Sequence, residues 1–278
     1  MYRLLLLCLS FILPLAASEK PLILVTIAPY GYLIERIAEE TVEVATVIPS
    51  GVNMHIYEPT IRELTSAQRA SIWFQVGETF EERAGKTLQE KNPHLKLLAL
   101  WKMVPLLEGG CSHCKHHDTR DRHIWTSPRL ILVQCHEMAK VLTLLQPQHE
   151  QLYRKNLEAL EKELIELDGY IHEQLKPLQG SALLVSHPAF GYFCKDYEIT
   201  QLSVESSGRD PLPKDVEDIL KKAQHYKVRA VFTQKGYNNK GAELIAEKLK
   251  LPVFCVDPYA RDYLENMRQM VELIEPSR

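Results

Sequence analysis

Short, nearly continuous apolar runs alternate along the chain with segments of helical periodicity. The apolar runs lie at 22–28, 42–48, 71–76, 96–99, 182–186, 199–203, 228–233 and 252–256. A continuous run, rather than an alternating one, is typical of a strand covered on both faces, as in a parallel sheet. Helical patterns separate the runs at 30–40, 61–70, 79–90, 129–145, 214–225 and 238–249. This alternation predicts an α/β fold with two lobes, each a mainly parallel four-stranded sheet flanked by helices.

The segment from Pro147 to about Lys176 has a different pattern. Leucine and isoleucine recur there mostly at steps of three and four, and Glu, Lys and Gln fill most other positions. A continuous helix of about 30 residues would be roughly 45 Å long. We therefore expect one long, rigid helix over 146–178 that joins an N-terminal lobe (19–145) to a C-terminal lobe (179–278). A coiled-coil segment is the alternative.

The first eighteen residues resemble an export signal. Arg3 precedes an apolar run of ten residues from Leu4 to Leu13, and Pro14 and small residues follow. Ten apolar residues are too few to span a bilayer, which needs about 20. Cys8 lies inside the run and does not resemble a lipid-attachment cysteine. We expect 1–18 to be a cleaved signal peptide and the mature protein to be released into the periplasm; a buried N-terminal helix is the alternative.

The composition does not indicate a function, but it argues against binding to nucleic acid or to an anionic membrane surface. The chain has 278 residues, 45% of them apolar, and 33 basic against 36 acidic side chains give a formal charge of −3. A chain without a basic field is not expected to bind nucleic acid or an anionic membrane surface. No other stretch approaches 18 uninterrupted apolar residues, so we expect no membrane span in the mature protein, and we expect a monomer.

The cysteines permit disulfides without requiring them. Five of the six remain after the predicted cleavage, and an odd number cannot all pair within the chain. Cys194 and Cys255 both lie in the C-terminal half and make the best candidate pair.

Three histidines and one aspartate occupy equivalent places beside predicted strands. His55 follows the run that ends at 48, and His187 directly follows the run 182–186. His123 precedes a helix that Ser127 and Pro128 begin, and Asp257 ends the last strand. Ligands of open α/β sheets bind outside the carboxyl ends of the strands. We therefore predict that these residues share one ligand-binding site between the lobes.

Ordered segments of the chain resemble a known family. They are Val25–Pro29 (VTIAP), Gly51 with His55-Ile-Tyr-Glu-Pro59, His123-Ile-Trp with Ser127-Pro128, the long helix, and Ser186–Phe193 (SHPAFGYF). Nearly the whole mature chain is similar to the cluster A-I solute-binding proteins of bacterial zinc and manganese ABC importers, the ZnuA and TroA types. Met54 and Arg122 stand where that family usually has proline.

The resemblance implies a metal held between the lobes by His55, His123, His187 and Asp257. Three imidazoles and one carboxylate can complete a tetrahedron and suit Zn²⁺, with Mn²⁺ as the alternative. The implied function is capture of the ion outside the inner membrane and its delivery to the membrane permease of an ABC importer.

A second cluster of ligand-type residues lies at 109–118. Cys111, His113, Cys114, His116 and His117 follow two glycines there, and zinc-type members of the family often carry a His-rich loop at this place. An auxiliary metal site and a solvated loop with a Cys111–Cys114 disulfide are both consistent with the sequence.

Two other classes of function compete. An exported zinc hydrolase could use three histidines, but the chain has neither a His-Glu-x-x-His pair nor a Gly-x-Ser-x-Gly elbow. A surface adhesin would need exposed aromatic hot spots, and the sequence offers none. We therefore expect a binding protein and not an enzyme.

Overall fold

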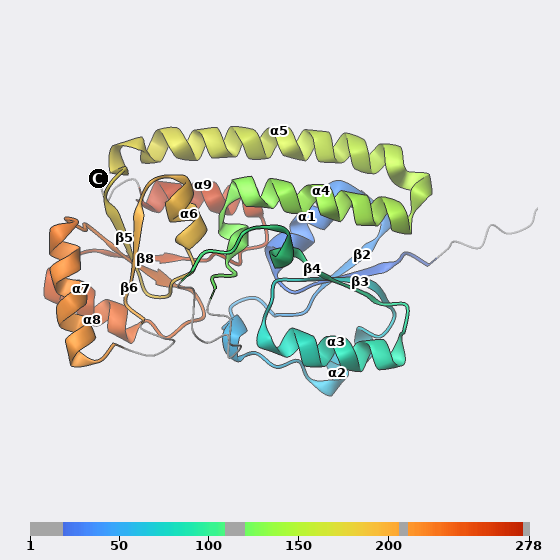
Figure 1. The fold of residues 1–278 in the computed structure, drawn as a ribbon, viewed down its shortest axis with the longest axis horizontal. Coiled ribbons are helices and arrows are strands. Elements are labelled where there is room, and N and C mark those ends of the chain that lie inside the picture. Colours follow the sequence, from blue (N-terminus) through green and yellow to red (C-terminus); the bar gives the residue numbers. More distant parts are fainter. Residues whose placement is uncertain (1–18, 109–119, 206–210, 275–278) are drawn as a thin grey trace, which may run out of the picture.

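A computed structural model describes residues 19–108, 120–205 and 211–274, which form two parallel four-stranded sheets (Figure 1). The first sheet has the order β2-β1-β3-β4, with β1 Leu22–Val25, β2 Glu43–Thr46, β3 Ala70–Gln75 and β4 Lys96–Ala99. The second has the order β6-β5-β7-β8, with β5 Ala182–Val185, β6 Thr200–Ser203, β7 Val231–Gln234 and β8 Val253–Val256. Adjacent strands are parallel throughout both sheets. The α/β architecture predicted from the apolar runs is confirmed.

Helices connect and cover these strands. The first half contains α1 Ala28–Ala38, α2 Ile61–Ser66, α3 Thr79–Lys91 and α4 Pro128–Leu145. The second half contains α6 Gly191–Asp196, α7 Pro213–His225, α8 Lys240–Leu249 and α9 Tyr263–Ile274. Ser127 begins α4 as predicted, because its hydroxyl accepts a hydrogen bond from the Leu130 amide at 3.1 Å. The sequence patterns missed α6 and α9.

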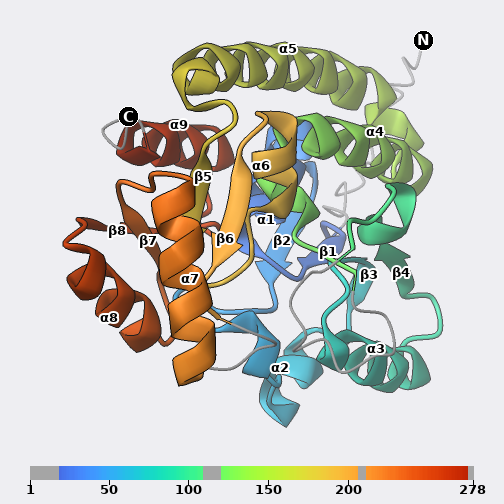
Figure 2. The same ribbon diagram turned by 60° about the vertical axis from the view of Figure 1, so that its left-hand side comes forward.

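The long helix α5 (Glu150–Leu175) extends over both sheets along one side of the molecule (Figure 1). Short 3₁₀ turns at Pro147–His149 and Lys176–Leu178 flank it, so the chain is helical through almost the whole predicted range. It packs on α1 and α4 in the first half and on α9 in the second, and Figure 2 shows α4 and α9 beneath it. Neither α5 nor another helix in the described ranges is long and apolar enough to cross a membrane.

One hydrophobic core runs through both halves. The same cluster of buried side chains includes Ile23 of β1, Leu164 of α5, Phe232 of β7 and Met270 of α9. Burial of apolar surface contributes about 25 cal/mol per Å². Opening the two sheets as separate bodies would expose part of this core, so the fold resists wide hinge motion.

The predicted Cys194–Cys255 disulfide is wrong, since both thiols are free. Cys194 belongs to α6 and lies in the core, where burial raises the pKa of its thiol well above the ordinary value. Cys255 is exposed on β8, the edge strand of the second sheet. Membership of the same half of the sequence did not place the two sulfur atoms together.

Candidate metal centre

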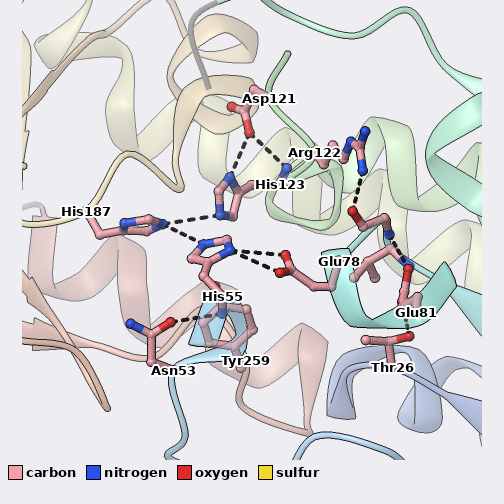
Figure 3. Close-up of polar contacts among 12 residues, drawn as sticks. Thr26, Asn53, His55, Glu78, Glu81, Asp121, Arg122, His123, His187 and Tyr259 are labelled. Atoms are coloured by element: carbon pink, nitrogen blue, oxygen red, sulfur yellow. Dashed lines mark hydrogen bonds and ion pairs between the residues drawn. The ribbon is translucent and has the colours of Figure 1, made fainter. Parts of the chain in front are cut away.

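Three imidazoles from distant parts of the chain converge between the two sheets (Figure 3). Nε2 of His187 lies 3.1 Å from Nε2 of His55 and 3.4 Å from Nε2 of His123. One ligand atom from each of the three lies within 4.8 Å of the other two. The side chains are 2%, 3% and 1% exposed for His55, His123 and His187. The cluster is thus screened from solvent.

A carboxylate holds the other ring nitrogen of each histidine. Nδ1 lies 3.1 Å from Glu78 for His55, 2.7 Å from Asp121 for His123 and 2.6 Å from Glu205 for His187. A carboxylate accepts the proton of Nδ1, and the neutral ring then directs the Nε2 lone pair at the centre of the cluster. Carboxylate–histidine pairs of this kind orient metal ligands and make them more basic.

The two Nε2 separations from His187 fit a tetrahedral ion. With Zn–N bonds of about 2.0–2.1 Å, two ligands of a tetrahedron lie about 3.3 Å apart. The observed separations of 3.1 and 3.4 Å match that edge. Three negative carboxylates behind the rings also favour a cation at the centre.

Local structure fixes His55 and its partner. His55 belongs to a single 3₁₀ turn, Met54–Ile56, and its amide donates to the Asn53 side chain at 2.9 Å. Glu78 comes from the loop after β3. Burial alone would raise the pKa of the Glu78 carboxyl, but attraction to His55 and the hydrogen bond to its ring dominate and lower that pKa below the ordinary value. Glu78 is therefore ionised beside the ring at neutral pH.

His123 is fixed by its own neighbour in sequence. Oδ1 of Asp121 accepts from both the amide and Nδ1 of His123, at 2.9 and 2.7 Å. The Tyr192 hydroxyl donates to the Asp121 carbonyl at 2.7 Å. A Cβ on Gly191 would lie 2.6 Å from Oδ2 of Asp121, so glycine is needed there for the close approach.

Arg122 links two loops of the site. Its guanidinium donates to the Gly77 carbonyl and lies 4.3 Å above the centre of the Trp101 ring. Gly77 directly precedes Glu78, so Arg122 links the loop that carries His123 to the loop that supports His55. Met54 is buried beneath its own turn.

Asp257 lies apart from the three histidines. Its carboxylate accepts from the Tyr259 amide at 3.0 Å and lies 3.4 Å from the Lys235 ammonium. The group of potential ligands among the described residues contains His55, His123 and His187 and not Asp257. Its assignment as the fourth ligand stays a prediction. The predicted auxiliary loop, with Cys111, His113, Cys114, His116 and His117, lies outside the described residues.

Sequence reasoning missed the three supporting carboxylates. Glu78 and Glu205 lie two or three residues after β3 and β6, and so at carboxyl ends of strands, as His55 and His187 do after β2 and β5. Asp121 stands two residues before His123. Extending the strand-end argument from histidine to glutamate would have found two of the three.

Known proteins with the same fold and sequence pattern identify the family. The family model described as "Zinc-uptake complex component A periplasmic" (ZnuA) matches residues 23–276. A relative from Chlamydia trachomatis serovar D is 29% identical over 251 residues, 90% of this chain and 89% of its own length. The manganese-binding lipoprotein MntA of Bacillus subtilis is 22% identical, over 84% of this chain and 78% of its own. A crystal structure of ZnuA superposes with a TM-score of 0.86 at 28% identity, covering 93% of this chain and 99% of that one.

The family model spans nearly the entire described chain, both sheets and the long helix included. Members of this family are periplasmic or extracellular transport binding proteins, not enzymes. The converging imidazoles lie where the two halves of that shared fold meet. The chain therefore belongs to the ZnuA family, the metal-binding solute-binding proteins of ABC importers.

Proposed function

We propose that this protein captures one divalent transition metal ion, Zn²⁺ before Mn²⁺, at His55, His123 and His187, and delivers it to the permease of an ABC importer. The observation that carries the proposal is the convergence of three Nε2 atoms at 3.1 and 3.4 Å. Each ring has its other nitrogen on a carboxylate, so all three present a lone pair to the same point.

Zinc is favoured by the donor set. The three carboxylates nearest the rings contact Nδ1 atoms and support the imidazoles rather than replace them. Neutral nitrogen donors suit zinc, whereas Mn²⁺ prefers oxygen. The family description names zinc uptake, and the manganese-binding relative MntA keeps Mn²⁺ as the alternative ion.

Asp257 is our candidate for the fourth ligand. It stands at the carboxyl end of β8, the edge at which ligands of parallel sheets bind. A carboxylate with three imidazoles closes a four-coordinate site and leaves no position for an activated water. Ligation would require the carboxylate to leave Lys235, 3.4 Å away, for the ion.

The remaining parts of the proposal come from the sequence and the family. We keep 1–18 as a cleaved signal peptide, the periplasm as the location and a monomer as the form that binds. The loop 109–118 remains a candidate auxiliary site. Docking on the permease is assigned to the faces of the two lobes beside the histidines.

Calorimetric titration of the metal-free protein, residues 19–278, tests this function. We expect one tight Zn²⁺ per chain, weaker binding of Mn²⁺ in competition, and loss of any further weak equivalents when 109–118 is deleted. Asp257→Ala is expected to weaken the tight site and keep its stoichiometry. No tight binding of either ion would reject the proposal.

Support of His187 by Glu205 gives a separate prediction. Glu205→Ala removes the acceptor 2.6 Å from Nδ1, and the ring loses its fixed orientation and part of its basicity. Zinc affinity is expected to fall about 10- to 100-fold, as it does when other groups that hydrogen-bond to metal ligands are removed. Glu205→Gln keeps an acceptor and is the matched control, with a smaller loss. Equal affinities of wild type and Glu205→Ala in a competition titration would contradict the assigned role.

A further inference from the structure

The loop between β7 and α8 reaches across to the first half of the molecule. Gly236 has φ +82°, and a Cβ there would lie 2.7 Å from the carbonyl oxygen of Gly51. Gly51 belongs to the loop after β2, a few residues before His55. Backbone from one half thus lies directly against backbone from the other, close to the histidine cluster.

The next residue, Tyr237, covers two of the imidazoles. Its ring centre is 4.7 Å from that of His187 and 6.1 Å from that of His55. Its hydroxyl lies 3.0 Å from the Tyr259 hydroxyl, and the two rings are parallel within 5°. Tyr259 in turn packs on Trp125, which contacts His123 at 5.2 Å. Aromatic rings therefore line the cluster on the side of this loop.

The Asn239 side chain supports the shape of the loop. Oδ1 of Asn239 accepts from the Gln234 amide at 3.1 Å, and Nδ2 donates to the carbonyls of Gln234 and Tyr237 at 2.9 and 3.2 Å. These three hydrogen bonds lie within the six residues 234–239 and fix the turn that follows β7. This turn therefore helps to position Tyr237 over the imidazoles.

We infer that residues 235–239 form a cover over the metal site, with Tyr237 as the residue that controls how fast the ion enters and leaves. The inference rests on the proposed function and adds to it a residue outside the ligand set. The aromatic ring excludes water from the imidazoles, and no atom of Tyr237 is required to bind the ion. Because the loop contacts both halves of the molecule, the Gly236–Gly51 contact has to open before the ion can pass. Entry and release of the ion therefore depend on a local separation of the two halves.

Stopped-flow kinetics on metal-free and Zn²⁺-loaded protein test the cover. Tyr237→Ala is expected to release Zn²⁺ to excess chelator about tenfold faster and to bind it faster as well, so the dissociation constant changes less than either rate. Tyr237→Phe keeps the ring and is the matched control, with rates near wild type. A side chain that merely supports His187 would change release alone.

A backbone variant tests the contact between the halves. Gly236→Ala places a Cβ against Gly51. Gly180 has a similar positive φ, +77°, and open space where a Cβ would be, so Gly180→Ala is the matched control. We expect faster exchange in Gly236→Ala only. Wild-type exchange rates in both Tyr237→Ala and Gly236→Ala would overturn the cover. Absence of zinc binding by the wild type would instead reject the proposed function.

Discussion

Replacement of His187 by alanine is expected to abolish tight zinc binding while the protein stays folded. Structural zinc sites bind with about 10–16 kcal/mol, so each of four ligands carries roughly 3–4 kcal/mol, a factor of about 100 to 1,000 in affinity. His187 touches both other Nε2 atoms of the group, which makes it the central member. Calorimetry on metal-free protein gives the affinity directly.

The fold gives a reason to expect this variant to remain intact. His187 lies just beyond the carboxyl end of β5, and the shared hydrophobic core does not include it. Far-ultraviolet circular dichroism and the unfolding temperature of the metal-free variant should match wild type. His225→Ala, an exposed histidine of α7, is the matched control and should bind zinc normally. Unchanged affinity in His187→Ala would remove this residue from the site.

The central strands could be predicted because a strand that is buried along its whole length is apolar in sequence. β1 is buried at all four positions, and its sequence Leu-Ile-Leu-Val is apolar throughout. α5 was predictable for a similar reason, since its leucines recur on one face. α6 and α9 were missed. α6 is a six-residue helix, too short for a clear period. α9 has an ordinary helical period that was overlooked, with a buried face made of Tyr263, Met267, Met270, Val271 and Ile274.

The histidines could be anticipated for a topological reason. Parallel strands bring their carboxyl ends to one edge, so His55 and His187 were expected to meet although 132 positions separate them. No comparable rule predicts which side chains form pairs with one another. The sequence cannot say that Lys235 engages Asp257, because that pairing depends on the conformation of the β7–α8 loop. The Cys194–Cys255 prediction failed for the same kind of reason: proximity within a lobe does not decide which face a side chain occupies.

Stability of the metal-free protein is expected to fall as the pH rises from about 4.5 to 7, through Glu81. This carboxyl is buried at the start of α3, and burial is the main cause that raises its pKa from 4.5 to about 7. Within that window the folded protein keeps the proton that the unfolded chain has lost. The folded state then binds more protons, so the free energy of unfolding decreases with pH, by roughly 3 kcal/mol in total.

Chemical denaturation at a series of pH values measures this loss, with Glu81→Gln as the test and Glu82→Gln, exposed on the same helix, as the control. The free energy of unfolding of wild type minus that of Glu81→Gln should decrease across the window and level off above pH 7. A constant difference would show that Glu81 does not hold its proton in the folded protein.

The Glu81 carboxyl also holds a loop in place, which explains why a buried group that lowers stability at neutral pH is present. It accepts hydrogen bonds from the amides of Val76 and Gly77, at 3.0 and 2.7 Å, and from the Thr26 hydroxyl. These contacts fix the loop after β3, whose next residue is Glu78, the partner of His55. Glu81→Gln cannot accept at both oxygen positions, so we expect it to weaken zinc binding as well, and less than His187→Ala, because it acts on His55 through two intervening groups. If Glu81→Gln bound zinc as tightly as Glu82→Gln, the hydrogen bonds of Glu81 would stabilise the loop without supporting the metal site.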